Sequence, residues 1–340
     1  MEIHVTAGPA CLTEPRLSEL LTAGVTSVRL NMSYVNEETL DSTISRIRQI
    51  APHVKIGADI RGRKLRIGSV PNDKVALKAG QVFRLYAAPD TNKYAKAGAE
   101  DYAYVSYPAI ASKVNTGAVI LLDDGAITLT VTKIKDGEII CSVETDAELT
   151  SGCGVNTPGC PIELPPLSAK DYGDIERLSK LSIDFVYLSY VERASDIIIL
   201  KETLRRYNMK DTVIAKVELA EAVKNLEEIC AASDAICIAR GDLGVEVDLP
   251  KIPYVQRHIV KTVKQSGRPV LLAGEVMLSL VNRYKPFRAE LTDVITALEQ
   301  GVDGFILSDE TAIGVDPANA VRHLQALIGE HNLRTGGQCE

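Results

Sequence analysis

The chain has 340 residues, of which 46% are hydrophobic and 24% charged, a balance that is ordinary for a globular protein with a sizeable core. Its formal net charge of -7 argues against nucleic acid as the main partner. The sequence contains no apolar run of about 18 residues that would span a membrane, and MEIHVTAGP at the N-terminus does not resemble a signal peptide. Seven cysteines without a CxxC pair favour reduced thiols and a cytoplasmic location.

Short runs rich in Val, Ile and Leu recur along the chain, as is typical of parallel strands that are buried on both faces. Eight such strands are predicted at 3–6, 27–31, 54–59, 185–189, 213–217, 235–239, 269–273 and 304–308. Eight helical patterns accompany them, at 15–23, 37–50, 169–181, 194–207, 220–232, 252–266, 289–300 and 317–328. This alternation predicts an α/β fold of the (β/α)₈ or TIM-barrel type. A doubly wound open sheet is the alternative, although neither a GxGxxG nor a GxxxxGK[ST] loop occurs.

The alternation is interrupted once, between about residues 67 and 164, where short strands and turns replace it. The DDG and DG sequences in this stretch are typical of hairpin turns. We therefore expect a small β-barrel lid domain at 67–164, inserted after the third barrel strand. The barrel itself is predicted at 1–66 and 165–332, followed by a tail at 333–340. An insertion at the mouth of a barrel is suited to excluding water from the site.

Polar residues follow two neighbouring strands of the predicted barrel. Lys216 and Glu218 end the first strand, and Arg240, Gly241 and Asp242 follow the second. Because the carboxyl ends of parallel strands form the site in such folds, these side chains are expected to meet there. An amine beside two carboxylates predicts a divalent cation and an anionic substrate.

Short motifs in chain order make the sequence resemble the pyruvate kinase family along nearly its whole length. TAGPA at 6–10 resembles the family's TIGPA, RLNMS at 29–33 resembles RLNFS, and DIRGRKLRIG at 59–68 resembles DTKGPEIRTG. Further along, ILLDDGAI, GVNTPG and IAKVE resemble ILLDDG, GVNLPG and IAKIE, while IARGDLGVE is almost unchanged from the family's sequence. RAE and LSDETA resemble TRAE and LSGETA.

The resemblance implies a glycolytic phosphotransferase that acts on phosphoenolpyruvate and ADP, forming pyruvate and ATP. It implies that Lys216 and Arg29 are catalytic, with Lys216 neutralising the transferred phosphoryl group, and that Glu218 and Asp242 bind Mg²⁺ or Mn²⁺. The other implied roles are grouped by ligand: Arg29, Arg66, Gly241, Asp242 and Gly274 for the substrate; Asn31, Ser33 and Asp59 for a monovalent cation; Thr6, Pro9, Tyr34 and Cys153 for the nucleotide.

Several positions depart from the family pattern. Lys64 replaces a glutamate of DTKGPEIR, and a fixed ammonium beside Asp59 would remove the requirement for potassium; a solvated surface lysine is the alternative. Tyr34 replaces a histidine, and Cys153 replaces a lysine that reaches the nucleotide phosphates, so reduced nucleotide binding is expected. Gly274 replaces a threonine of ATQML, which would admit a larger substrate or a different electrophile.

Glu275 replaces the glutamine of the same ATQML motif, where it adds a carboxylate near the metal or caps a helix. The family's C-terminal effector-binding domain has no counterpart here, so the usual allosteric control is not expected. Family members commonly pair through barrel helices, so a homodimer is expected.

Three functions remain open. The first is pyruvate kinase-like, potassium-independent phosphotransfer. The second is a metal-dependent reaction through an enolate of pyruvate or another 2-oxo acid: an aldolase, a decarboxylase or a specialised biosynthetic enzyme that uses phosphoenolpyruvate. The third is a non-catalytic sensor of phosphoenolpyruvate, against which the retention of Lys216 argues.

Overall fold

A computed structural model describes residues 1–35, 38–88, 98–160 and 162–336 of the chain. The molecule divides into two compact units, of which the first comprises Met1–Gly62, Pro166–Leu243 and Lys251–Glu340. The second comprises Arg63–Pro165 and Gly244–Pro250. Within the described residues, no helix is both long and apolar enough to cross a bilayer.

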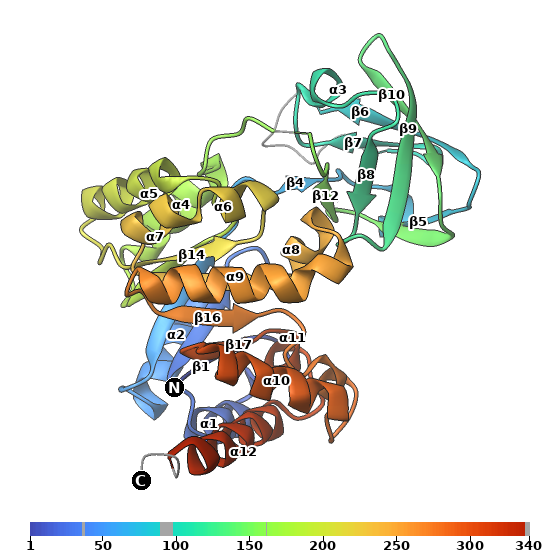
Figure 1. Ribbon diagram of the computed structural model, residues 1–340. Coiled ribbons are helices and arrows are strands. Elements are labelled where there is room, and N and C mark those ends of the chain that lie inside the picture. Colours follow the sequence, from blue (N-terminus) through green and yellow to red (C-terminus); the bar gives the residue numbers. More distant parts are fainter. Residues whose placement is uncertain (36–37, 89–97, 161, 337–340) are drawn as a thin grey trace. The chain divides into compact units, whose positions relative to one another are not determined.

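The first unit is a closed barrel of eight parallel strands, in the spatial order β1-β17-β16-β15-β14-β13-β3-β2 (Figure 1). The predicted (β/α)₈ barrel is therefore confirmed. Each strand overlaps a predicted apolar run, because a strand covered on both faces leaves a continuous hydrophobic segment. The strands are β1 (Glu2–Thr6), β2 (Ser27–Asn31), β3 (Lys55–Ile60), β13 (Phe185–Leu188), β14 (Val213–Val217), β15 (Ala235–Ala239), β16 (Val270–Ala273) and β17 (Gly304–Leu307).

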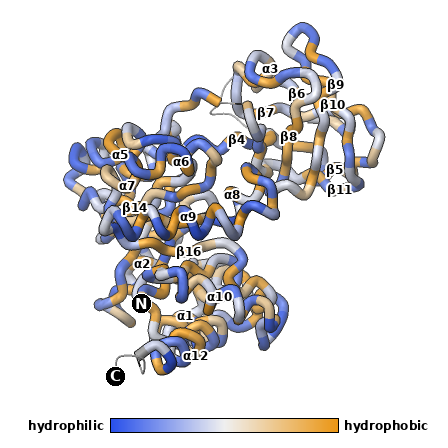
Figure 2. The backbone as a smooth tube through the Cα atoms, viewed as in Figure 1, coloured by the Kyte–Doolittle hydropathy of each residue, from blue (hydrophilic) through white to orange (hydrophobic). Residues whose placement is uncertain are grey.

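Helices cover the outside of the barrel, and their buried residues recur at helical spacing. In α9, for example, Gln256, Ile259, Val260 and Val263 are buried, and Figure 2 shows helices that alternate between hydrophilic and hydrophobic along their length. The longer helices are α1 (Glu14–Thr22), α2 (Leu40–Ile50), α4 (Ala169–Leu178), α5 (Ala194–Arg206), α9 (Ile252–Gln265), α10 (Arg288–Gln300) and α12 (Pro317–Gly336). The shorter ones are α6 (Ala220–Lys224), α7 (Leu226–Ala232), α8 (Arg240–Glu246), η2 (Leu249–Lys251), η3 (Leu278–Val281) and α11 (Asp309–Ala312).

Some helices differ from the predicted pattern. The segment predicted as one helix at 220–232 is divided at Asn225 into α6 and α7, where the Asn225 side chain donates to the Glu192 carbonyl (2.9 Å). The last helix, α12, runs beyond residue 328 to Gly336, into the predicted tail, and residues 337–340 lie outside the described part. The predicted start of the second helix also falls on undescribed residues (36–37), and α2 begins at Leu40.

The interior of the barrel is a packed core. Phe185, Tyr187, Ile214, Leu271 and Ile306 are among the residues that form a buried cluster there. Gly57 on β3 leaves room for it, because a Cβ at that position would lie 2.2 Å from the Phe185 ring. The packed interior confines polar chemistry to the ends of the strands.

The second unit is a β domain built mainly on a seven-stranded sheet in the order β4-β12-β8-β9-β10-β6-β7. A bridge between Ile67, which follows β4, and Val105 in β7 joins the two edges, so the sheet closes on itself. The strands are β4 (Leu65–Arg66), β6 (Val82–Ala87), β7 (Tyr102–Val105), β8 (Val119–Leu122), β9 (Ile127–Lys135), β10 (Glu138–Val143) and β12 (Gly154–Asn156), beside a two-stranded sheet of β5 (Lys74–Leu77) and β11 (Ala147–Thr150), with η1 (Pro71–Asp73) and α3 (Ile110–Lys113).

The turns of this domain have the backbone that their sequences predict. Asp136 (φ 51°) and Gly137 (φ 82°) connect β9 to β10, and Asp123, Asp124 and Gly125 also have positive φ between β8 and β9. Two successive residues with positive φ match the right-handed twist of a hairpin, which is why Asp-Gly is favoured there. The predicted β insertion after the third barrel strand is confirmed, although its residues 89–97 and 161 lie outside the described part.

Candidate active site

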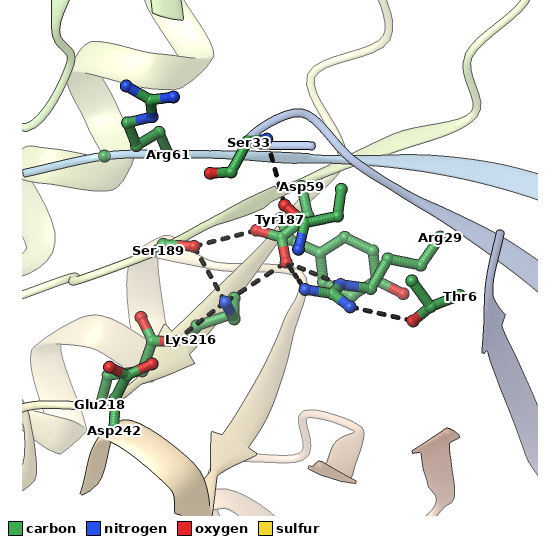
Figure 3. A network of polar contacts seen from close by, with 12 residues as sticks. Thr6, Arg29, Ser33, Asp59, Arg61, Tyr187, Ser189, Lys216, Glu218 and Asp242 are labelled. Atoms are coloured by element: carbon green, nitrogen blue, oxygen red, sulfur yellow. Dashed lines mark hydrogen bonds and ion pairs between the residues drawn. The ribbon is translucent and has the colours of Figure 1, made fainter. Parts of the chain in front are cut away.

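Five charged side chains from four segments gather at the carboxyl end of the barrel (Figure 3). Arg29 lies on β2, Asp59 on β3 and Lys216 on β14. Glu218 follows β14 directly, and Asp242 lies in the first turn of α8, immediately after β15. The strand-end placement that the sequence predicts for Lys216, Glu218 and Asp242 therefore matches their positions in the first unit.

Lys216 is the centre of this cluster. Its ammonium lies 2.8 Å from Glu218 Oε1 and 3.3 Å from Asp59 Oδ2, and it donates to Ser189 Oγ at 2.9 Å (Figure 3). Burial alone would lower the pKa of Lys216, but the charges of Asp59 and Glu218 outweigh it and raise the pKa above its ordinary value. Lys216 is therefore a fixed cation at neutral pH rather than a general base.

Arg29 forms a second fixed cation beside the first. Its Nε and Nη2 lie 2.7 and 2.6 Å from Asp59 Oδ2, and its Nη1 donates to Thr6 Oγ1 at 2.9 Å. Burial would raise the pKa of Asp59, but Lys216 and Arg29 hold it below its ordinary value. Asp59 thus stays ionised, and two cations share this one carboxylate.

Glu218 and Asp242 have an electrostatic conflict that a cation would relieve. Glu218 is 1% exposed; burial, together with the charge of Asp242, raises its pKa to about 7 in spite of Lys216. Among the described residues, no group of three or more His, Cys, Asp or Glu side chains forms a metal site. Two carboxylates are nevertheless a suitable donor set for Mg²⁺, which usually keeps several waters and takes its other ligands from substrate phosphates.

Two further residues at this site were not predicted. Ser189 and Tyr190 follow β13 in a turn: the Ser189 hydroxyl donates to Asp59 Oδ1 (2.9 Å), and the Tyr190 backbone N–H donates to Glu218 Oε2 (2.7 Å). The Tyr190 hydroxyl donates to Asp242 Oδ1 (2.5 Å). Their position at a strand end could have suggested a role in the site. The backbone turn that directs their polar groups toward Asp59, Glu218 and Asp242 is not visible in the sequence.

Comparison with known proteins identifies the family. The family model described as "Pyruvate kinase, barrel domain" matches residues 1–321. The chain belongs to the pyruvate kinase family.

Individual relatives agree with this assignment. The chain is 35% identical to a pyruvate kinase from Geobacillus stearothermophilus over 98% of its own length and 57% of the relative's. It is 32% identical to one from Corynebacterium glutamicum, over 96% and 68%. A crystal structure of a pyruvate kinase from Cryptosporidium parvum superposes with a TM-score of 0.88 at 31% identity, over 98% of this chain and 69% of that one. The chain thus spans little more than half the length of its Geobacillus relative.

The loop after β16, where this chain departs from the family's ATQML, has a local reason for its glycine. Gly274 has a positive φ (86°), and a Cβ there would lie 2.7 Å from the Gly241 backbone N. Its carbonyl accepts two bonds from Arg240 (3.0 and 2.9 Å), which tie the loop to the start of α8. Glu275 is exposed, and its backbone carbonyl accepts from Arg240 (3.1 Å). Gly274 therefore permits close approach of two backbone segments, as well as leaving the position without a side chain.

A cavity of about 520 Å³ lies beside Arg29 in the first unit. Thr6, Pro9, Asn31 and Tyr34, which the family resemblance places on the nucleotide and monovalent-cation side, all line it. Arg29 and Asp309 are the charged residues among its described lining, and the other lining residues are neutral. Ser33 lies nearby, where its backbone N–H donates to Asn31 Oδ1 (3.1 Å). Among its described lining residues, this cavity is therefore poor in cations.

Three predicted site residues belong to the second unit. Lys64 pairs with Asp124 (3.2 Å), and its stem lies over Gly154, where a Cβ would be 2.5 Å from Lys64 Cε. Arg66 donates from Nη1 to the Gly152 carbonyl (2.8 Å). Cys153 is 7% exposed within the core of the domain. Burial raises the pKa of its thiol to about 12, so Cys153 is neutral. A charge-neutralising role for Lys64 beside Asp59 stays a prediction.

Proposed function

We propose that this chain catalyses pyruvate kinase-like phosphoryl transfer from phosphoenolpyruvate, with a divalent cation held by Glu218 and Asp242. The observation that carries the proposal is the fixed ammonium of Lys216 between Asp59 and Glu218 (3.3 and 2.8 Å) at the carboxyl end of the barrel. Phosphoryl transfer depends mainly on positioning and on charge stabilisation, and a buried, permanently protonated lysine supplies both.

The roles of the residues follow from their contacts. Mg²⁺ or Mn²⁺ held by Glu218 and Asp242 would supply positive charge to phosphoryl and enolate oxygens. The three N–H groups of Lys216 already contact Glu218, Ser189 and Asp59. The contact to Asp59 is the longest of the three and therefore the one that a phosphoryl oxygen would replace with the smallest loss of interaction energy. Arg29 then balances Asp59, while Ser189 keeps the ammonium in place.

The proposal is tested by coupling pyruvate formation to NADH oxidation, with phosphoenolpyruvate, ADP and Mg²⁺, in the wild type and in Asp242→Asn. Turnover that chelation abolishes, and that falls at least about 100-fold in the variant, would support the assignment. Equal turnover and equal metal affinity in both proteins would show that Asp242 is not a metal ligand.

A second candidate is a metal-dependent enzyme that forms an enolate of pyruvate or a related 2-oxo acid, with reduced nucleotide binding. The cation-poor acceptor cavity and the neutral, buried Cys153 favour it. It predicts that Mg²⁺ and the protein alone exchange the methyl protons of pyruvate for deuterium from D₂O, without any nucleotide. ATP formation from phosphoenolpyruvate and ADP would favour the first candidate instead.

Three finer points belong to the same proposal. We propose that no potassium is required, because Lys64 supplies a fixed positive charge. We also propose a homodimer, which sedimentation would test, and a cytoplasmic location, which fractionation would test.

A further inference from the structure

One residue contacts both carboxylates of the proposed metal site. Tyr190 lies directly after β13 and is 6% exposed. Its backbone N–H donates to Glu218 Oε2 at 2.7 Å, and its phenol donates to Asp242 Oδ1 at 2.5 Å. The two carboxylates come from the ends of β14 and β15, so a third strand holds them together.

The backbone of Tyr190 is strained in a way that this double contact explains. Its φ of 55° lies in the left-handed region, which is unfavourable for a residue other than glycine. Strain of this kind persists where the surrounding structure fixes it, and it concentrates at functional sites. Here the turn directs the amide of Tyr190 to one carboxylate and its ring to the other.

The contacts also leave each carboxylate in a defined orientation. Glu218 Oε2 accepts a hydrogen bond from the Tyr190 backbone N–H, and Oε1 is paired with the Lys216 ammonium. Contacts to both oxygens fix the plane of the carboxylate. Asp242 lies in the first turn of the short helix α8, directly after Gly241, and a hydrogen bond from a buried phenol restricts its rotation. Partners that orient metal-binding carboxylates commonly contribute about 10–100-fold to metal affinity.

We infer that Tyr190 is a positioning residue that holds Glu218 and Asp242 in the arrangement that binds the divalent cation. This inference rests on the proposed metal site. The backbone amide sets Glu218, and the hydroxyl sets Asp242, so only the second half is removed by Tyr190→Phe. That variant keeps the ring, its packing and the amide contact.

The test is a Mn²⁺ titration by calorimetry and by electron paramagnetic resonance, on protein without substrate. Tyr190→Phe is expected to raise the Mn²⁺ Kd about 10-fold. The activation constant for the metal should rise equally, while kcat at saturating metal changes less than about 3-fold. Tyr187→Phe is the matched control: Tyr187 lies on β13, just before Tyr190, and among the described residues its phenol contacts His4 of β1 (2.6 Å) rather than a carboxylate. The Mn²⁺ affinity of this control should stay at the wild-type value.

The outcomes separate the inference from the proposal beneath it. One outcome is that the wild type binds Mn²⁺, that Asp242→Asn does not, and that Tyr190→Phe binds Mn²⁺ at least as tightly as the wild type. In that case the positioning role of Tyr190 is wrong, but the metal site is supported. If the wild type binds no Mn²⁺, the metal site and the positioning role both fail. Equal circular dichroism spectra establish that the variants are folded.

Discussion

Replacing Lys216 with methionine tests the electrostatic account of the site most completely. Methionine keeps most of the volume and removes the charge. Glu218, which is 1% exposed, then loses its cation and keeps the Tyr190 amide, while Asp59 still has Arg29 and Ser189. Leaving a buried carboxylate without its partner costs about 3–5 kcal/mol of unfolding free energy.

The loss should depend on pH in a defined direction. Because the pKa of Glu218 is raised from 4.5 to about 7 in the folded protein, its contribution to stability declines as pH rises through that window. Removing Lys216 raises the pKa further, so the decline continues above pH 7 at about 1.4 kcal/mol per unit. The destabilisation by Lys216→Met should therefore be about 1 kcal/mol larger at pH 8 than at pH 6.

The assay is denaturant unfolding followed by far-ultraviolet circular dichroism, which reports mainly on the barrel helices of a chain without tryptophan. Metal is removed with a chelator, since a bound cation would replace the lost charge. Lys201→Met is the control: Lys201 pairs with the half-exposed Asp234 (2.8 Å), and its removal should cost no more than about 1 kcal/mol. If Lys216→Met lowers the free energy of unfolding no more than Lys201→Met does, or by the same amount at pH 6 and pH 8, then Lys216 does not stabilise the Glu218 carboxylate.

Three other outcomes are expected. Because Glu218 has a pKa of about 7, Mn²⁺ should bind about 10-fold more weakly at pH 6 than at pH 8. Calorimetry should also detect the release of a proton on binding, and a Kd that does not change with pH would contradict this expectation. Gly274→Ala should lower the free energy of unfolding by about 1–3 kcal/mol in a thermal melt, because its Cβ would lie 2.7 Å from Gly241 N. Gly267→Ala should cost less, because a Cβ at that position would have no atom within 4 Å. Equal costs for the two variants would contradict the close approach of the backbone at Gly274. Lys64→Glu should make activity depend on potassium, and stimulation of the wild type by potassium would show that Lys64 does not replace the ion.

The barrel was predictable because its physical constraints leave a continuous trace in the sequence. Strands buried on both faces need unbroken apolar runs, and all eight runs became barrel strands. The helices were less predictable at their interruptions and ends. Asn225 divides α6 from α7 through a contact with Glu192, far away in sequence, and α8 forms despite Gly241 and Gly244.

The charged half of the site was also predictable, because Lys216, Glu218 and Asp242 lie at or just after the ends of neighbouring strands, and the carboxyl ends of parallel barrel strands must meet. Ser189 and Tyr190 follow such a strand too, but their roles depend on a turn with a positive φ at a tyrosine, which propensity disfavours. Gly274 has a backbone reason that appears only when the loop after β16 is seen beside the start of α8.

The most direct measurement is ³¹P magnetic resonance of phosphoenolpyruvate, ADP and Mg²⁺ with the wild type and with Lys216→Met, in the absence of potassium. The wild type is expected to form one ATP for each phosphoenolpyruvate and ADP consumed, and the variant is expected to be at least about 100-fold slower. Undiminished transfer by Lys216→Met, or no transfer to ADP by the wild type, would contradict these expectations.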